Sequence, residues 1–204
     1  MNIFAWIFAV INSVAPVDGP QWLNDSKETV AEATSRYESI AKDLVDVVFD
    51  PNEKPLYDGP NGRVKTAAVI LAIDSFESGF RKDVDYGIGS QSRGDHGSSW
   101  CLGQINLGDN RFLLKPDGSF EYSSKEGWSG RDLVNDRKKC FRAQLAILRL
   151  SYQCPITDDE QKLNLYASGS CYGGVWHSRN RMKRAQRFLD QTTLVDDDIL
   201  KPKK

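Results

Sequence analysis

A strongly apolar segment, Val64 to Phe76, constrains the fold of this chain more than any other part of its sequence. The segment has the length of a helix and is apolar on nearly every face, which predicts a helix that is buried on all sides. Gly79 follows shortly after it and is a typical helix stop. A chain of 204 residues is long enough to surround such a helix with one domain and a sizeable core.

Glu77 stands directly after this apolar segment. A carboxyl group at the end of a buried helix lies partly out of water, and desolvation disfavours its ionised form. Such a group keeps its proton closer to neutral pH, which is the property that a general acid needs. The alternative interpretation, a surface carboxylate at a helix end, fits poorly with the apolar residues before it. Glu77 is therefore our candidate catalytic residue.

Three short motifs follow one another along the chain. The first reads Glu-Ser-Gly-Phe from Glu77, the second Leu-Gly-Gln-Ile from Leu102, and the third, over residues 163–169, Leu-Asn-Leu-Tyr-Ala-Ser-Gly. In this order they resemble the motifs of the soluble lytic transglycosylase and goose-type lysozyme superfamily. The resemblance covers roughly residues 60 to 190, which is the span of a single domain.

The chain departs from the family pattern at two places. Its second motif has Leu-Gly-Gln, ending at Gln104, where the family usually has Gly-Leu-Met-Gln. In the third motif Tyr166 falls on the family's tyrosine, and Ala167 replaces the asparagine of Ala-Tyr-Asn-x-Gly. The resemblance implies a mainly α, lysozyme-like domain with long loops and a small β-hairpin, and a substrate cleft between the Glu77 helix and the loops around Gln104.

The superfamily cleaves the β-1,4 bond between N-acetylmuramic acid and N-acetylglucosamine, so the resemblance implies peptidoglycan glycan strands as the partner. Its lytic transglycosylases use one carboxyl group. Glu77 would protonate the glycosidic oxygen and then take the proton of the muramoyl 6-hydroxyl, which attacks its own anomeric carbon and gives a 1,6-anhydro product. The usual pair of glycosidase carboxylates is not needed, and no metal or organic cofactor is implied.

Five further residues are candidates for binding substrate, and most of them have a structural alternative. Gln104 can bind an N-acetyl amide, because its side chain both donates and accepts, or it can bond backbone within a loop. Tyr166 can orient the catalytic acid through a hydrogen bond, or pack as an aromatic residue on a helix. Ser78 serves a local turn or reaches the site, and Asn106 is a weaker candidate. Trp100 can stack on a sugar face or belong to the core.

Two other functions stay open. Hydrolysis, by a lysozyme-type muramidase of the same fold, needs a carboxylate that activates water on the opposite face of the sugar, and Asp83, Asp85 and Asp95 are available in residues 81–99. A candidate from another class is a virion or cell-wall structural component whose lysozyme-like domain only binds glycan. A phage tail or ejection protein can also combine both roles.

The four cysteines, Cys101, Cys140, Cys154 and Cys171, have no Cys-x-x-Cys spacing, and the chain has only two histidines. A zinc site is therefore a poor interpretation. An even number of cysteines suits two disulfides in an oxidising compartment. Three connectivities are possible, and we favour Cys101–Cys140 with Cys154–Cys171. Buried free thiols in a cytosolic protein are the alternative.

The chain divides into an apolar N-terminal segment with a linker (1–24), a catalytic domain (25–192) and a polar tail (193–204). The apolar run Ile3 to Val14 is too short to span a bilayer. It resembles the core of a secretory signal peptide, although no Lys or Arg precedes Lys27. The alternative is an apolar element packed in the mature protein or in an assembly. We expect a periplasmic or secreted protein, or a phage virion component, with attachment to a membrane or virion through residues 1–16.

The net charge of -1 gives no global field that would attract nucleic acid. Positive charge is nevertheless concentrated in residues 137–149 and 179–187. Each segment can be a solvated helix face, which we favour, or a patch that meets the anionic cell wall.

Apolar spacing and capping residues predict the remaining elements. The glycine-rich residues 81–99 are expected to form an irregular loop. We expect a helix that begins at Asp25, with Asp25 and Glu28 as a capping pair, and a hairpin around Phe112 and Phe120. Three more helices are expected: one over residues 136–152, one from Thr157 with Glu160 as its capping partner, and one over about 178–190.

Overall fold

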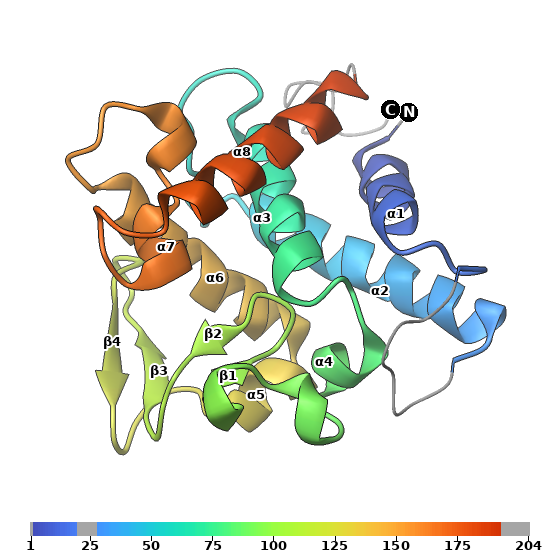
Figure 1. Ribbon diagram of the computed structural model, residues 1–204, viewed down its shortest axis with the longest axis horizontal. Helices are drawn as coiled ribbons and strands as arrows, with labels where there is room; N and C mark the ends of the chain where they lie inside the picture. The colour runs from blue at the N-terminus through green and yellow to red at the C-terminus, as the bar shows by residue number, and fades with distance from the viewer. Residues whose placement is uncertain (1, 20–27, 193–204) are drawn as a thin grey trace.

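The structure is a computed structural model that describes residues 2–19 and 28–192. This part of the chain is mainly helical and carries two small antiparallel sheets (Figure 1). Its helices are α1 (Ile3–Val14), α2 (Val30–Val48), α3 (Gly62–Glu77), α4 (Lys82–Tyr86), α5 (Gly130–Asn135), α6 (Arg137–Tyr152), α7 (Asn164–Ser168) and α8 (Val175–Asp190). The strands are β1 (Ser99–Trp100), β2 (Ile105–Asn106), β3 (Arg111–Leu114) and β4 (Phe120–Ser123), and three 3-10 turns are η1 (Ser90–Ser92), η2 (Asp95–Gly97) and η3 (Asp159–Gln161).

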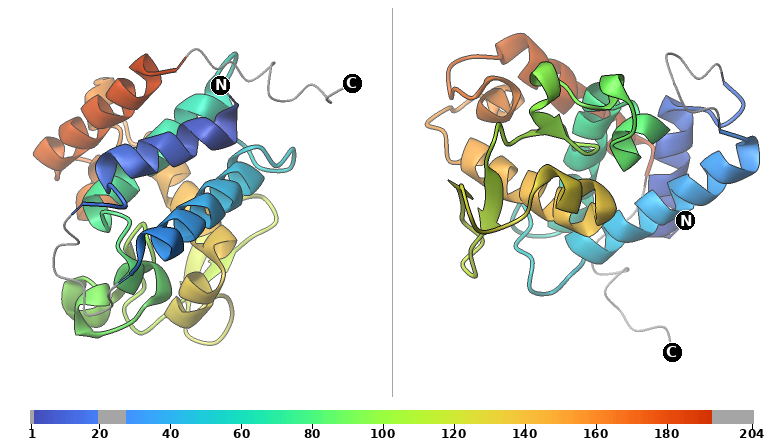
Figure 2. Two further views of the ribbon diagram at one scale, coloured as in Figure 1. Left: turned by 90° about the vertical axis from the view of Figure 1, so that its right-hand side faces the viewer. Right: turned by 90° about the horizontal axis from the view of Figure 1, so that it is seen from below.

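The helix α3 occupies the centre of the molecule, and α1, α2, α6 and α8 pack against it (Figures 1 and 2). Every residue from 66 to 75 is buried, which confirms the predicted buried helix. Fully burying an aliphatic side chain contributes about 1.5–3 kcal/mol. Ile70, Leu71 and Ile73, all without solvent exposure, therefore make α3 a main source of the stability that fixes Glu77 in place.

The apolar N-terminal segment forms α1, which lies beside α2 and also contacts α3 (Figure 2). The indole Nε1 of Trp6 donates a hydrogen bond to the carbonyl oxygen of Phe188 in α8 at 3.3 Å. In the structure this segment is thus a helix packed on the helical body. None of the helices in the described ranges has the length and hydropathy needed to cross a bilayer. The buried residues of α1 are Ile3, Trp6, Ile7, Val10 and Ile11.

The second helix begins at Val30, five residues later than predicted, and Asp25 itself lies outside the described residues. Thr29 and Glu32 form the capping box: the Thr29 amide donates to Glu32 Oε2 at 2.8 Å, and Thr29 Oγ1 accepts from the Glu32 amide. Glu28 has a different partner, because Arg36 is buried on the inner face of α2 and forms a two-pronged ion pair with it. A buried guanidinium needs such a counter-charge.

Residues 81–99 are more ordered than the expected irregular loop, since they contain α4, η1, η2 and the start of β1. Ion pairs organise this segment. Asp83 is paired with Arg81, and Asp85 is paired with Arg137 of α6 at 2.6 Å. Both aspartates are buried; the Asp83 pair is internal to the segment, and the Asp85 pair holds the segment on α6.

The predicted hairpin is confirmed as β3 and β4, with Phe112 opposite Tyr122 and Leu114 opposite Phe120. Phe112 is fully buried and stacks on Phe120 at a ring-centroid distance of 4.7 Å. Aromatic contacts of this kind stabilise a short hairpin beyond its backbone hydrogen bonds. The hairpin stands beside α6 and forms one edge of the molecule (Figure 1).

The C-terminal third agrees with the sequence prediction in part. α6 begins after the cap Asp136, as expected, and α8 begins three residues earlier than expected. The helix predicted from Thr157 is wrong: Asp158 caps the turn η3 instead, and α7 follows as a separate short helix. Asp158 outcompetes Thr157 because its carboxylate accepts from the Glu160 amide at 2.9 Å.

Both predicted disulfides are present, Cys101–Cys140 and Cys154–Cys171, and the described part of the chain has no free cysteine. The free-thiol alternative is therefore wrong for this structure. The first bond ties the segment before Gln104 to α6, and the second ties the end of α6 to the segment before α8. Both are compatible with a protein of an oxidising compartment.

Candidate active site

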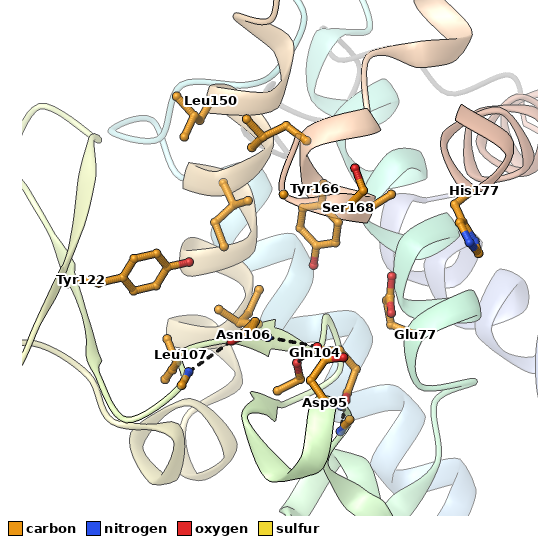
Figure 3. A pocket seen from close by; sticks show the side chains of 18 of the residues that line it. Glu77, Asp95, Gln104, Asn106, Leu107, Tyr122, Leu150, Tyr166, Ser168 and His177 are labelled. Atoms are coloured by element: carbon orange, nitrogen blue, oxygen red, sulfur yellow. Dashed lines mark hydrogen bonds between the residues drawn. The ribbon is translucent and has the colours of Figure 1, made fainter. Parts of the chain in front are cut away.

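A groove of about 1000 Å³ opens beside the C-terminal end of α3 (Figure 3). Its walls come from α3, α6, α7, α8, the β3–β4 hairpin and the segment around β2. Glu77, Gln104, Asn106 and Tyr166 all line it. The structure thus brings together four of the six residues that the sequence marked as site candidates.

Glu77 is the last residue of α3, and its side chain keeps 22% of its surface accessible. In Figure 3 its carboxyl group faces the space between Tyr166 and Gln104. Residues 66–75 of α3 are buried, whereas Phe76, the last residue of the predicted buried segment, is 40% exposed, so the carboxyl group stands at the border between core and groove. This is the placement that the apolar segment predicted.

Ser78 serves the turn after α3 and does not line the groove. It is buried, and its hydroxyl donates to the Asp74 carbonyl oxygen at 2.8 Å and accepts from the Phe80 amide at 3.2 Å. The chain reverses here through Gly79 and Phe80, which both have positive φ. Ser78 therefore supports the backbone just beyond Glu77.

The residue that sequence reasoning missed is Arg181 of α8. Its Nη2 forms an ion pair with Glu77 Oε1, and its side chain is 8% exposed. The ion pair fixes the position of the Glu77 carboxyl group at the edge of the groove. A sequence signal existed: Arg181 shares the buried face of α8 with Ser178, Ala185 and Phe188, and a buried arginine needs a carboxylate.

Gln104 lines the groove, but its amide is engaged with backbone. Oε1 accepts from the Gly94 amide at 2.7 Å, and Nε2 donates to the carbonyl oxygen of Cys101 at 3.1 Å. Its own φ is 49°, in the left-handed region that few non-glycine residues adopt. Gln104 in this structure matches the backbone-bonding alternative, and it fixes the loop that carries Asp95.

Asp95 is the carboxylate that the loop presents to the groove. Its Oδ2 accepts from Ser99 Oγ at 2.7 Å and from the side-chain Nδ2 of Asn106 at 3.1 Å. Asn106 thus orients a carboxylate rather than standing free to bind a ligand through that nitrogen. Asp83 and Asp85, the other two candidates for a second carboxylate, are buried in ion pairs and do not line the groove.

Tyr166 projects into the groove from α7 (Figure 3). Its hydroxyl donates to the carbonyl oxygen of Gly103 at 2.5 Å, instead of the expected bond to Glu77. Burial raises the pKa of the phenol well above its usual value, and the negative charge of Glu77 acts in the same direction. Tyr166 is thus a neutral residue with a fixed side-chain position in the wall of the groove.

Trp100 does not line the groove. Its ring packs on Gly130, where a Cβ atom would lie 2.1 Å from the indole, and the Arg93 guanidinium stands 4.6 Å from the ring centroid. Gly130 is needed because any side chain would collide with this ring. Trp100 is therefore a packing residue, as in the core alternative.

His177, Tyr122 and Ser168 also line the groove and were not marked by the sequence. In Figure 3, Tyr122 lies across the groove from Glu77 and His177. Tyr122 is 49% exposed, so its ring is open to a ligand. Ser168 lies within the third motif, whereas no short motif surrounds His177 or Tyr122, and only the tertiary fold places these two residues here.

The positive charges of residues 137–149 and 179–187 are largely paired within the protein. The first segment binds acidic residues of α2 and of the loop after it, and the second binds Glu77, Glu160 of η3 and its cap Asp158. Such pairing supports a solvated helix face over a patch for anionic cell wall. The pairs include Arg137–Asp43, Lys138–Asp46, Arg142–Asp50, Arg149–Glu53, Arg179–Asp158 and Lys183–Glu160.

In the described ranges no cluster of three or more His, Cys, Asp or Glu side chains is arranged to hold a metal ion. No protein-family model, no curated protein and no solved structure matches the chain.

Proposed function

We propose that the protein is a lysozyme-like peptidoglycan lytic transglycosylase that cleaves the β-1,4 bond between N-acetylmuramic acid and N-acetylglucosamine. The observation that carries this proposal is the carboxyl group of Glu77, which stands at the end of a buried helix and faces a groove of about 1000 Å³. The motif resemblance supplies the substrate, and the geometry supplies an acid with space for a ligand beside it.

Glu77 acts twice in the proposed reaction. Its protonated form donates to the glycosidic oxygen as the bond to the anomeric carbon breaks. The resulting carboxylate accepts the proton of the muramoyl 6-hydroxyl, whose oxygen forms the new bond to the same carbon. Proton and electron pairs balance without water, and Glu77 returns to its starting form.

The guanidinium of Arg181 holds the Glu77 carboxyl group in position by an ion pair, and part of the Glu77 side chain stays accessible to the groove. Tyr166 and, across the groove from Glu77, Tyr122 offer aromatic surface, which suits the apolar face of a sugar. The two disulfides support a place of action in an oxidising compartment, such as the periplasm, the exterior or a virion.

A second candidate function is hydrolysis of the same bond, and Asp95 favours it. This carboxylate lines the same groove as Glu77 and is oriented by Ser99 and Asn106. A carboxylate so placed can activate water, as in glycosidases with two acidic groups. The remaining alternative, a structural component that only binds glycan, uses the same groove without chemistry.

The test is product analysis after digestion of purified peptidoglycan. Transglycosylation predicts muropeptides with 1,6-anhydro ends, which are lighter by one water than the reducing-end products of hydrolysis. Mass spectrometry separates the two directly. Reducing ends alone would replace the transglycosylase by the muramidase. Binding of the chain to peptidoglycan without any released fragment would leave the structural alternative.

A further inference from the structure

A buried polar pair lies behind the groove, one helical turn before Glu77. Asp74 of α3 and Gln144 of α6 have no solvent exposure, and Gln144 Nε2 donates to Asp74 Oδ1 at 2.9 Å. The remaining oxygens, Asp74 Oδ2 and Gln144 Oε1, have no hydrogen-bond partner among the described residues. Each unsatisfied buried acceptor is costly, and here two of them belong to one contacting pair.

We propose that Asp74 is a neutral carboxylic acid whose Oδ2–H donates to Gln144 Oε1, so that the two side chains form a cyclic pair of hydrogen bonds. A protonated carboxyl group and a primary amide each present one donor and one acceptor on the same edge. An ionised Asp74 has acceptors only and would leave Gln144 Oε1 facing a second acceptor. One proton therefore satisfies both oxygens.

The charged surroundings favour this proton. Burial raises the pKa of Asp74 well above its usual value; the bond from Gln144 opposes this, and the charges of Glu77 and Asp85 add to the increase. Tyr166 of α7 also interacts with Asp74 and is itself neutral. The guanidinium groups nearby have other partners, since Arg181 of α8 pairs with Glu77, and Arg36 of α2 pairs with Glu28 and Asp85.

The pair reaches the groove through Gly103. A Cβ atom on Gly103 would lie 2.9 Å from Gln144 Cδ and 2.9 Å from the Tyr166 hydroxyl oxygen, and the Gly103 carbonyl accepts the Tyr166 hydroxyl. Gln144 thus forms the surface on which Gly103 rests, and Gly103 fixes Tyr166. Asp74 and Gln144 are positioning residues for this side of the site, a role that rests on the proposed function of the groove.

Asp74→Asn is the matched variant, because an amide at position 74 keeps both hydrogen bonds and does not titrate. A carboxyl group whose folded pKa lies above its unfolded pKa lets the folded state hold a proton that the unfolded state has lost. Stability then falls as pH rises from the unfolded pKa towards the folded pKa. Relative to Asp74→Asn, the unfolding constant of the wild type should rise about tenfold per pH unit from about pH 4 upward.

Urea unfolding of both proteins over this pH range measures the effect, and equal pH dependence would overturn the neutral acid. Infrared spectroscopy of the wild type provides a readout that does not need the variant to fold. A carbonyl band of a protonated carboxyl group should be present at neutral pH and shift in heavy water. Absence of the band at neutral pH would also overturn the proposal.

Kinetics on peptidoglycan test the positioning role. Asp74→Leu removes both hydrogen bonds and should lower kcat more than it changes KM, and Asp74→Asn should restore kcat. Full kcat in a folded Asp74→Leu protein would overturn that role. If the wild type releases no fragments at all, the proposed function fails, while the unfolding and infrared results still decide the state of Asp74.

Discussion

On one side of the groove, Glu77 and Arg181 stand on α3 and α8, two helices of 16 residues each that pack against one another. On the other side, Asp95, Gln104 and Asn106 stand on a segment of turns and two-residue strands. The helical wall is held by buried apolar side chains. The loop wall is held by hydrogen bonds from side chains to backbone and by the Cys101–Cys140 disulfide.

The loop wall also contains backbone conformations that favour glycine. Asp95, His96, Cys101 and Gln104 all have φ between 48° and 59°, and such non-glycine positions cost of order 1–3 kcal/mol each. The bonds of Gln104 and the disulfide offset this cost. The comparison teaches that apolar truncation should damage the helical wall, whereas loss of specific polar or covalent links should damage the loop wall.

The largest effect is expected for Glu77→Gln, which should lower the rate of peptidoglycan cleavage by about two to four powers of ten. The amide retains the size of the side chain but cannot deliver a proton. Turbidity of a peptidoglycan suspension measures the rate, and circular dichroism checks the fold. Glu126→Gln, on an exposed residue, is the control. Near-wild-type cleavage by folded Glu77→Gln would end the assignment of the acid.

Ile70→Ala tests the helical wall. Truncating a fully buried isoleucine leaves a cavity and should cost about 2–5 kcal/mol of unfolding free energy. Urea denaturation measures the change, and Lys65→Ala, on an exposed position of the same helix, should cost little. A loss below about 1 kcal/mol at Ile70 would show that α3 does not carry the stability that its burial indicates.

Replacing Cys101 and Cys140 together by alanine tests the loop wall. The bond closes 39 residues, for which the chain-entropy relation gives about 4 kcal/mol, against about 3 kcal/mol for the 17 residues of Cys154–Cys171. Thermal unfolding compares the two double variants. Hydrogen exchange should increase around Gln104 only in the first. An equal increase of hydrogen exchange around Gln104 in both double variants would contradict a separate role for the Cys101–Cys140 bond.

The smallest effect is expected for Asp95→Asn. If Glu77 acts alone, the variant should keep cleavage within about tenfold of the wild type, because no second carboxylate takes part in the chemistry. Hydrolysis predicts a loss of about two to four powers of ten, as for removal of a general base. The ratio of anhydro to reducing ends, measured in the same digests, shows which of the two reactions the groove performs.

The sequence allowed correct prediction of features whose cause is local. The α3 segment is apolar on nearly every face, and Glu77 follows it directly, so both could be placed without knowledge of a distant segment. The hairpin around Phe112 is marked by turn residues. The preferred disulfide pairing is also present, although it joins residues that are 39 and 17 positions apart. The starts of two helices were predicted wrongly: Thr29 is the cap of α2, and Asp158 displaces the adjacent Thr157 as the cap of η3.

Features that depend on two distant segments were not predictable in the same way. Arg181 lies 104 residues from Glu77, and Gln144 lies 70 residues from Asp74. Neither pair has a spacing that a motif can mark. Gln104 illustrates the converse, since its motif indicated ligand binding while its amide is engaged with the backbone of the loop. The tertiary fold decides which polar groups stay free.

The helix α8 connects the N-terminal helix α1 with the groove. His177 and Arg181 near its start border the groove. Near its end, the carbonyl oxygen of Phe188 accepts a hydrogen bond from the indole of Trp6 in α1. Sixteen residues of helix make a rod about 24 Å long. Loss or displacement of α1 would remove the support at one end of this rod, so that α8 could tilt and move the guanidinium of Arg181 relative to Glu77. The position of α1 thus affects the geometry of a groove that α1 does not line.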